Sequence, residues 1–283
     1  MFKLKLMAFL LSLNGTFCNC NFEKRQLGFE KNKGWYKVKK IGRLPSTLKE
    51  TSALEIADNG TYWTLQDSGG EPLLFKVNGS GDIKDTLSIP GTVNKDWEEL
   101  AQDSQGYLYI GDIGNNSNLR KDLAVYKLDL SSKRVEILKF NYHDQTQFPP
   151  ERKQMNYDCE AYFWLDGNLH LFSKNRGVKM VKHYELPDTA GTYTLKVKDA
   201  LTLKGKVTAA DISPDGKLMA LLSYGKVWLF KVKNVDDLWS KPFKCVKINR
   251  GQTEGLIFVN NTDILISNET GGLYLVAQNA ERE

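Results

Sequence analysis

The feature that most constrains this chain is a five-fold internal repeat of short apolar strands. Each copy opens with a polar or acidic residue, continues through a second apolar strand that ends in polar residues and glycine, and closes with a third strand. Spacings of 46, 62, 49 and 45 residues separate the equivalent positions Ser52, Glu98, Glu160, Ala209 and Glu254. This period is typical of a four-stranded propeller blade. We therefore predict an all-β fold, a five-bladed β-propeller over residues 35–277.

The two ends of the repeat region predict how the ring closes. After Glu254 there is room for about three strands, and one spare strand candidate, 35–41, precedes the first blade. We expect this N-terminal strand to complete the last blade, because an open ring would leave an unpaired edge. The longest spacing contains a polar stretch with two prolines, 141–155, which we interpret as an inserted loop. A six-bladed propeller, with a further blade in this spacing, is the alternative.

Residues 1–20 have the pattern of a secretion signal. Lys3 and Lys5 precede the short apolar run 7–13, and small and polar residues follow. We predict a signal peptide over 1–20, a linker over 21–34 and a C-terminal tail over 278–283. The protein is then exported: periplasmic, at the outer surface, or secreted. Lipid anchoring at Cys18 or Cys20 is an alternative, but the preceding Gly-Thr-Phe is a poor lipobox, so we favour cleavage near Cys20 and loss of both cysteines.

Cysteine and charge exclude several classes of protein. Cys159 and Cys245 would remain after cleavage, and two cysteines in so long a chain do not make a disulfide scaffold. The formal net charge of +5 comes from lysines dispersed along the strands, whereas nucleic-acid binding needs a concentrated basic stripe. No later segment is apolar enough to be a transmembrane helix. We expect a monomer that binds a small molecule or a surface ligand and does not bind nucleic acid.

The propeller geometry predicts a site at one mouth of the central channel. The residues that open each innermost strand and those that close the second strand meet at the same face. The openers are Ser52, Glu98, Glu160, Thr208 (beside Ala209) and Glu254. We predict that the openers are metal ligands. The closers and their neighbours, which we predict to bind a ligand, are Asp67, Asp112, Asn115, Asn116, Lys174, Tyr224, Asn268 and Glu269.

Glutamates gathered in a narrow funnel favour a hard divalent cation. Like charges that are close and partly desolvated must take up protons or bind a cation. Calcium accepts six to eight oxygen ligands and fits such a ring better than magnesium. Transition metals are disfavoured, because His143, His170 and His183 lack ligand spacing. The alternative is that the acids are solvated, or accept hydrogen bonds from backbone N–H groups of neighbouring blades. The loop 112–116 likewise has two interpretations, a ligand loop or an ordinary Asn/Gly turn.

Three motifs resemble a known family. They are Asp96-Trp97-Glu98-Glu99-Leu100-Ala101 with Gly111–Asn116, Asn156–Ala161, and Gln252–Leu256. In these motifs the chain resembles uncharacterised exported β-propeller proteins of Bacteroidetes-type bacteria, which have no assigned activity.

A more distant resemblance is to the calcium-activated nucleotidases, or apyrases. These are five-bladed propellers that hold calcium in the channel with serine and glutamate residues opening successive blades. Ser52, Glu98, Glu160 and Glu254 match that order, whereas Ala209 stands where a serine is expected and Thr208 is the substitute. The resemblance implies a calcium ion, but the remaining catalytic residues of the apyrases have no match.

Two functions follow from these observations. The first is an exported ligand-binding propeller whose central calcium organises the funnel. The second is a calcium-dependent hydrolase of phosphate esters, nucleotides or lactones, with Asp67, Asp112 or Glu269 as the base. The sequence contains no recognisable nucleophile motif, so it leaves open whether the protein is an enzyme.

Overall fold

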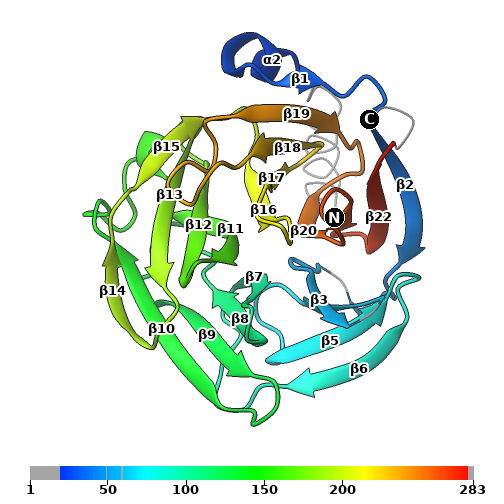
Figure 1. Cartoon of the computed structure of the whole chain (residues 1–283). Helices are drawn as coiled ribbons and strands as arrows, with labels where there is room; N and C mark the ends of the chain where they lie inside the picture. The colour runs from blue at the N-terminus through cyan, green and yellow to red at the C-terminus, as the bar shows by residue number, and fades with distance from the viewer. Residues whose placement is uncertain (1–19, 49, 59, 280–283) are drawn as a thin grey trace, which may run out of the picture.

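The computed structural model describes residues 20–48, 50–58 and 60–279. Its strands form five sheets arranged around a central channel, as Figure 1 shows. The predicted five-bladed β-propeller is therefore confirmed, and the six-bladed alternative is wrong.

Each blade is built from strands that follow one another outward from the channel. Blade 1 contains β3 (Glu55–Asp58), β4 (Thr61–Leu65), β5 (Leu73–Asn78) and β6 (Ile83–Ser88). Blade 2 contains β7 (Trp97–Gln102), β8 (Tyr107–Asp112), β9 (Leu123–Asp129), β10 (Val135–Tyr142) and β14 (Gly191–Leu195). Blade 3 contains β11 (Asp158–Leu165), β12 (Asn168–Lys174), β13 (Met180–Pro187) and β15 (Asp199–Thr202). Blade 4 contains β16 (Val207–Ile212), β17 (Leu218–Ser223), β18 (Lys226–Lys231), β19 (Pro242–Lys247) and β1 (Glu30–Lys31). Blade 5 contains β20 (Thr253–Phe258), β21 (Ile264–Asn268), β22 (Gly272–Gln278) and β2 (Tyr36–Arg43).

The long spacing between the second and third copies contains no further blade. The chain between β10 and β11 is a loop that carries the 3-10 helix η1 (Arg152–Gln154). An unexpected exchange occurs instead after β13, where β14 leaves blade 3 and pairs in parallel with the outer edge of β10. Blade 2 thus has a fifth strand, and β14 links blades 2 and 3 at the rim (Figure 1).

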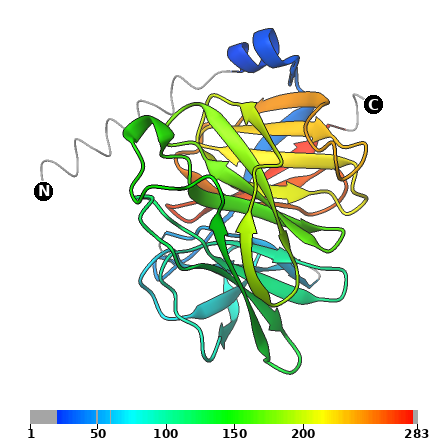
Figure 2. The same cartoon turned by 90° about the vertical axis from the view of Figure 1, so that its left-hand side faces the viewer.

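The hydrophobic core is divided into five clusters, one between each pair of adjacent blades. Tyr109 of blade 2 and Tyr162 of blade 3, for example, share a cluster and are fully buried. Because each blade buries both faces against its neighbours, the innermost strands are held in fixed positions around the channel. Figure 2 shows the twisted sheets from the side.

The predicted N-terminal strand closes the ring. β2 pairs antiparallel with β22, from Tyr36 opposite Gln278 to Arg43 opposite Gly272. This pairing covers the edge that the last blade would otherwise leave open.

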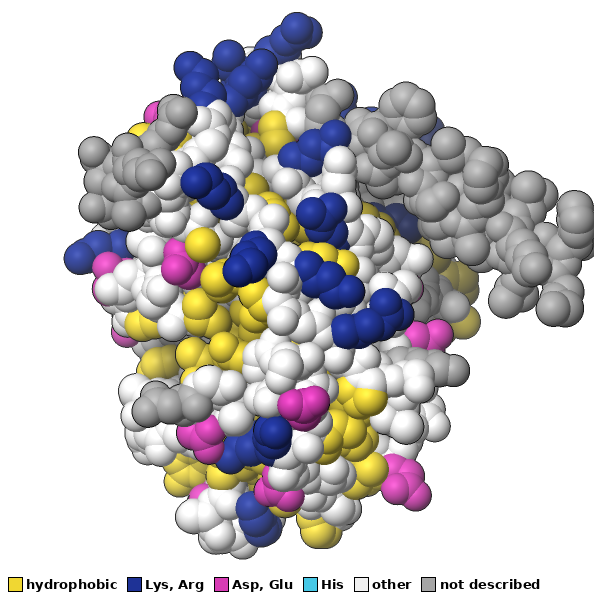
Figure 3. Space-filling view, turned by 90° about the vertical axis from the view of Figure 1, so that its right-hand side faces the viewer, with side chains coloured by type: hydrophobic (Ala, Val, Ile, Leu, Met, Phe, Trp, Pro, Cys, Tyr) yellow, Lys and Arg dark blue, Asp and Glu magenta, His cyan; other side chains and the backbone are white. Residues whose placement is uncertain are grey.

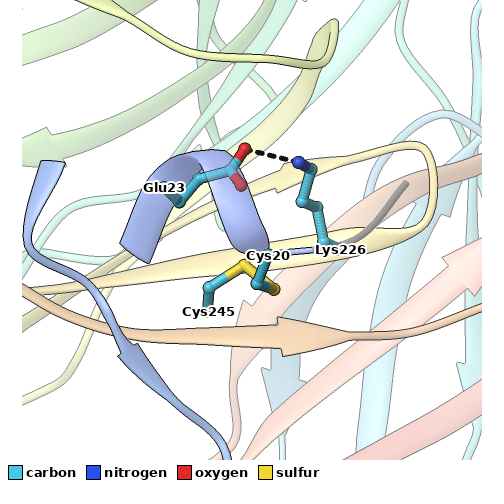
Figure 4. The surroundings of a disulfide bond; sticks show 4 residues. All are labelled: Cys20, Glu23, Lys226 and Cys245. Atoms are coloured by element: carbon cyan, nitrogen blue, oxygen red, sulfur yellow. Dashed lines mark hydrogen bonds and ion pairs between the residues drawn. A yellow bond between two sulfur atoms is a disulfide. The ribbon is translucent and has the colours of Figure 1, made fainter. Parts of the chain in front are cut away.

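The segment 21–34, which we predicted to be a linker, is a packed part of the fold. It contains α2 (Asn21–Leu27) and β1, which pairs in parallel with β19 at the outer edge of blade 4 (Figures 1 and 2). A disulfide joins Cys20 to Cys245 of β19, and Glu23 of α2 forms a buried ion pair with Lys226 (Figure 4). The sequence shows no spacing signal for a disulfide between residues 225 positions apart.

The disulfide corrects the expectation that Cys20 is discarded. Residues 1–19 of the predicted signal peptide, which include Cys18, lie outside the described residues. Residues 280–283 of the predicted tail also lie outside them. A cleavage that preserves the disulfide falls before Cys20, and a bonded Cys20 has no free thiol for a lipid. Cys159 is a buried free thiol.

On the face drawn in Figure 3, most Lys and Arg side chains gather over the upper half, among apolar and uncharged groups. The acidic side chains lie mainly at the edges of this face and in its lower half. Within the described residues, no helix has the length and apolar character needed to span a membrane.

Candidate functional site

A bulge interrupts the innermost strand of blades 2 to 5 near the same mouth of the channel. Trp97 and Glu99 pair with consecutive residues of β8, so Glu98 is the extra residue, and Glu160 and Thr208 are the extra residues in blades 3 and 4. Blade 5 has the same irregularity between Thr253 and Leu256. A bulge re-aims a side chain and is common beside active sites. In blades 2, 3 and 5 the repeated bulge is therefore the local device that turns the opening glutamates Glu98, Glu160 and Glu254 toward the channel.

These side chains line a cavity of about 180 Å³. The lining residues come from all five blades and include six carboxylates and two cations: Glu50, Thr51, Ser52, Asp67, Glu98, Asn116, Glu160, Lys174, Arg176, Tyr224, Glu254 and Glu269. The acids that were widely separated in the sequence thus share one site, as the rotational arrangement of the blades predicts.

Four of the five predicted metal ligands, Ser52, Glu98, Glu160 and Glu254, line this cavity. The fifth, Thr208, is buried and donates a hydrogen bond from its hydroxyl to the backbone oxygen of Thr253, at 2.7 Å. Its hydroxyl joins blade 4 to blade 5 and does not face the cavity.

The predicted ligand-binding residues divide in the same way. Asp67, Asn116, Lys174, Tyr224 and Glu269 line the cavity. The other three, Asp112, Asn115 and Asn268, lie outside it and hold turns.

Asp112 orients a neighbour of the cavity. Its carboxylate forms an ion pair with Arg120 at 3.0 Å and accepts a hydrogen bond from the backbone N–H of Asp96, also at 3.0 Å. Burial raises the pKa of Asp112, against the effect of Arg120. Asp112 therefore fixes the backbone from which Asp96 projects.

Asn115 and Asn268 hold loops together. The Asn115 side-chain amide donates to the carbonyl of Tyr157, and its backbone N–H donates to Asp158. The Asn268 side-chain oxygen accepts from the backbone N–H of Gly272 at 2.7 Å. For Asn115 the structure supports the turn interpretation of the loop 112–116.

One half of the cavity, which we call the paired half, contains acids already matched by cations. Glu160 forms ion pairs with Lys174 and with Arg176, the latter at 3.1 Å, and Arg176 also pairs with Asp158. The Lys174 ammonium lies 3.3 Å from the Tyr224 hydroxyl. These contacts are charge-assisted and buried. Removal of one partner of an ion pair would therefore leave the other as an uncompensated buried charge.

The paired half continues through Tyr224 to blade 5. The Tyr224 hydroxyl donates a hydrogen bond to Glu254 at 2.9 Å. Burial raises the pKa of Glu254 to about 7, with the Lys174 charge acting in the opposite direction. Burial likewise raises the pKa of Glu160 to about 8, although Lys174 and Arg176 oppose the shift.

The other half, the unpaired half, consists of the lining acids Asp67 and Glu98 and of Asp96, which lies beside them. One carboxylate oxygen from each residue lies within 4.8 Å of the others. Within the part of the chain that the structure describes, none of the three forms an ion pair. Burial and the charge of Asp67 raise the pKa of Asp96 to about 7, and burial and Glu160 raise the pKa of Glu98 well above its usual value.

Gly114 allows the unpaired half to form. A Cβ atom at this position would lie 2.3 Å from Oδ2 of Asp96 and 2.5 Å from Oε1 of Glu98. Only a residue without a side chain lets the backbone of the loop 112–116 come this close to the two carboxylates. This is a physical reason for the glycine in the Asp-Ile-Gly-Asn-Asn motif.

The donors of the unpaired half fit a hard cation. All three are carboxylates, and the lining side chains Ser52 and Asn116 add a hydroxyl and an amide oxygen to the same cavity. Oxygen donors of this kind suit calcium, which tolerates irregular coordination. The cavity contains no histidine or cysteine among its lining residues, so the donor set does not match zinc or copper.

Sequence reasoning missed Glu50, Thr51, Arg176, Asp96 and Asp158. The last two were visible in a repeated Asp-x-Glu pattern at 96–98 and 158–160, which places a second carboxylate two residues before each bulged glutamate. Glu50, Thr51 and Arg176 sit in loops where no repeat signal identifies them.

Three further acids of the inner strands serve the fold. Glu99 accepts from the backbone N–H of Leu100 and of Ala210, and Asp211 accepts from Phe258 of the next blade at 2.7 Å. Burial, with the Asp211 charge, raises the pKa of Glu55 to about 8. The alternative interpretation of channel acids as acceptors for backbone N–H groups of other blades applies to Glu99 and Asp211, which are not cavity residues.

Comparisons with known proteins identify the fold. No known protein family matches the chain, and no curated protein is significantly similar to it in sequence. Solved structures do match. A gluconolactonase-like protein gives a TM-score of 0.51 at 12% identity, covering 86% of this chain and 92% of its own. An aldose sugar dehydrogenase of Streptomyces coelicolor, solved with pyrroloquinoline quinone bound, gives 0.52 at 8% identity, covering 86% of this chain and 98% of its own.

A gluconolactonase of Xanthomonas campestris is also similar, with a TM-score of 0.49 at 10% identity, covering 86% of this chain and 90% of its own. At these identities the likeness concerns the fold alone. The resemblances to the exported Bacteroidetes-type family and to the apyrases stay predictions. The chain is similar in architecture to β-propeller proteins of the gluconolactonase and sugar dehydrogenase kinds.

Proposed function

We propose that the protein is a ligand-binding β-propeller that holds a divalent cation, best matched by calcium, in the unpaired half of the mouth. The observation that carries the proposal is the convergence of Asp67, Asp96 and Glu98 without a cationic partner among the described side chains. Three buried or half-buried carboxylates repel one another, and a divalent ion is the counter-charge that removes the cost without protonation.

The proposal moves the metal site relative to the sequence prediction. Glu98 stays a ligand and Ser52 stays close enough to line the same cavity, but Glu160 and Glu254 are engaged with Lys174 and Tyr224. Asp67 and Asp96 take their place. The cation therefore sits between blades 1 and 2 in this proposal.

The paired half would contribute the ligand-binding groups. Lys174 and Arg176, which have more N–H groups than their ion pairs use, present hydrogen-bond donors to the same cavity that the cation would occupy on the other side. A small ligand with anionic or hydroxyl oxygens suits a site with donors on one side and a divalent ion on the other.

Calcium titration of the purified chain by calorimetry tests the proposal. We expect one calcium to bind with higher affinity than magnesium, and Glu98→Gln and Asp96→Asn each to weaken calcium binding by about tenfold or more, since each removes a charged ligand. Glu50→Gln, which changes an acid of the same cavity outside the cluster, is the matched control and should bind calcium within about threefold of the parent. Equal losses in all three variants, or no calcium uptake by the parent, would overturn the proposal.

A second candidate is a cation-dependent hydrolase of lactones, phosphate esters or nucleotides. Glu269 favours it, because this carboxylate lines the cavity beside Glu254 and its pKa is raised by burial. A bound divalent ion would polarise a carbonyl or phosphoryl oxygen. Glu269 and Asp67 are the cavity carboxylates that could accept a proton from water, whereas Asp112 is engaged with Arg120.

A substrate screen separates the two candidates. The purified chain is assayed against lactones, phosphoesters and nucleoside diphosphates, with calcium and with a chelator. Turnover that is lost with chelator and in Glu269→Gln, while calcium binding is retained, establishes the hydrolase. Tight calcium binding without turnover of any class supports the binding protein.

Export is part of the proposal. The disulfide between Cys20 and Cys245 is compatible with an oxidising compartment. Fractionation of the native host, followed by mass determination of the mature N-terminus, tests export. A mature chain that begins at or shortly before Cys20 is expected.

A further inference from the structure

Two of the three histidines of the chain are buried side by side in blade 3, away from the cavity. His170 on β12 stands directly opposite Glu185 on β13, and His183 stands opposite Phe172, two residues along the same pair of strands. All four side chains therefore lie on one face of the sheet. Neither histidine is more than 1% exposed.

Three donor atoms of this group converge. His170 Nδ1 lies 3.0 Å from His183 Nε2 and 3.6 Å from Glu185 Oε1, and the three ligand atoms all fall within 4.8 Å of one another. Two ligands of a tetrahedral zinc ion, with metal–ligand bonds of about 2.0–2.1 Å, lie about 3.3–3.4 Å apart. The separations of 3.0 Å and 3.6 Å lie on either side of that value.

A neighbouring carboxylate already orients one histidine. His183 Nδ1 lies 3.1 Å from Oδ1 of Asp199 on β15. When Nδ1–H donates to this carboxylate, Nε2 carries the lone pair and points toward His170. A carboxylate that holds the far nitrogen of a histidine is the usual support of a histidine metal ligand.

Aromatic packing fixes both imidazole rings. Phe163 stacks on His170 with ring centroids 5.4 Å apart, and Phe172 stacks on His183 at 5.0 Å. Trp239, which blade 4 contributes, contacts His183 edge-on. The donors are thus held in place before any ion arrives, which lowers the cost of binding.

We propose that His170, His183 and Glu185 form a second metal site, specific for zinc or a similar borderline ion, with Asp199 as the supporting residue. Nitrogen donors distinguish this site from the all-oxygen cluster at the mouth, so the two sites select different ions. A water molecule or a second oxygen of Glu185 would complete the coordination.

One group competes for the site. Lys198 pairs with Glu185 and also with Asp236, the latter at 3.0 Å. The Lys198 side chain is about a quarter exposed, so it can shift to Asp236 when a metal takes Glu185. Glu185 is 29% exposed, which gives an ion a path from solvent.

Metal binding changes the nitrogen of His170 that carries the proton. When His183 donates Nδ1–H to Asp199, Nδ1–H of His170 donates to Nε2 of His183. Metal binding transfers this proton to Nε2 of His170, which has no hydrogen-bond partner among the described residues. The proton stays on the ring, so the balance needs no further acid or base.

Zinc titration of the untagged full chain, with cobalt as a spectroscopic probe, tests the proposal. We expect one zinc per chain by competition with a chromophoric chelator, and a visible absorption of four-coordinate cobalt that zinc displaces. His183→Gln and Glu185→Gln should each weaken zinc binding by about 100-fold or more because they remove a ligand. Asp199→Asn should weaken it by about 10–100-fold.

Two controls separate this site from others. His143→Gln alters the exposed third histidine and Glu98→Gln alters the mouth, and neither should change zinc affinity or the cobalt spectrum. Lys198→Met should raise zinc affinity several-fold, which a merely misfolded variant cannot do. Zinc uptake that survives His183→Gln in a chain with unchanged circular dichroism, or no four-coordinate cobalt spectrum in the parent, would overturn the proposal.

Discussion

The paired half and the unpaired half of the mouth are built from the same sequence pattern and have opposite electrostatics. Glu160 in blade 3 and Glu98 in blade 2 are the extra residues of a bulge in the innermost strand, and an aspartate, Asp158 or Asp96, stands two positions before each. The acids of blade 3 have Lys174 and Arg176 as partners. Those of blade 2 form no ion pair among the described residues.

The strand that pairs with each bulge explains the difference. Cys159 is opposite Ser173 and Trp97 is opposite Asp112, so the position of Lys174 in blade 3 is that of Ile113 in blade 2. By the same register, Arg176 corresponds to Asn115. One blade therefore carries its own counter-charges, whereas the acids of the other must take up protons or bind a cation.

Removal of a partner from the paired half should have the largest effect. Lys174→Met leaves Glu160 buried with Arg176 alone, and breaking a buried ion pair costs about 3–5 kcal/mol. We expect that loss of unfolding free energy in urea denaturation. The double variant with Glu160→Gln should recover most of it, and Glu98→Gln alone should not destabilise the chain. A loss below about 1 kcal/mol in Lys174→Met would mean that the pair is solvated.

The unpaired half should make stability depend on pH. The pKa of Asp96 is raised to about 7 by burial and by Asp67, so the folded chain binds a proton that the unfolded chain has released. Its contribution to stability is fully present below its unfolded pKa, near 3.8, and is lost as the pH rises to about 7 and above. Melting temperatures between pH 4 and pH 8 in chelator measure this effect.

Two changes should reduce that pH dependence. Calcium should raise the melting temperature more at pH 8 than at pH 5, because it replaces protons at the same carboxylates. Asp96→Asn should reduce the decrease in melting temperature with rising pH, even in chelator. If neither calcium nor Asp96→Asn alters the dependence of the melting temperature on pH, the titrating groups lie elsewhere in the molecule.

The loop glycine of the unpaired half allows a matched pair of variants. Gly114→Ala introduces a Cβ that would overlap Asp96 and Glu98, whereas the nearest atom to a Cβ at Gly70 is 3.9 Å away. We expect Gly114→Ala to weaken calcium binding by about tenfold or more and Gly70→Ala to leave it unchanged. Equal affinities in the two variants would show that the close approach of the backbone is not needed.

The smallest effect is expected at Thr208, the opener that the fold turns away from the cavity. Thr208→Val removes the hydrogen bond to the Thr253 carbonyl and should cost about 1 kcal/mol of unfolding free energy. Calcium affinity should not change. A loss of calcium binding in this variant would return Thr208 to the set of metal ligands.

The repeat made the fold and much of the mouth predictable from sequence. Glu98, Glu160 and Glu254 recur at blade spacing, so the symmetry of the propeller brings them together whatever the details of the loops. The grouping within the mouth depends on which side chains stand beside each acid. That information lies in strand register and in the bulges, which the spacing of the repeats does not contain.

Two other features could not be predicted from the sequence for the same reason. His170 and His183 are 13 residues apart, and only the pairing of β12 with β13 places their nitrogens 3.0 Å from each other. Cys20 lies close to Cys245 because β1 pairs with the edge strand β19. No local sequence pattern predicts this contact. Long-range pairing of this kind is a property of the closed ring.

The N-terminal segment also fixes the order in which the ring can be completed. β1 and β2 belong to blades 4 and 5, whose remaining strands are synthesised last. Blades 1 to 3 can assemble from contiguous chain, whereas the first strands to emerge must wait, unpaired, for β19 and β22. Completion of the ring thus depends on the pairing of β1 with β19 and of β2 with β22, and a chain truncated before β22 would keep β2 as an unsatisfied, association-prone edge.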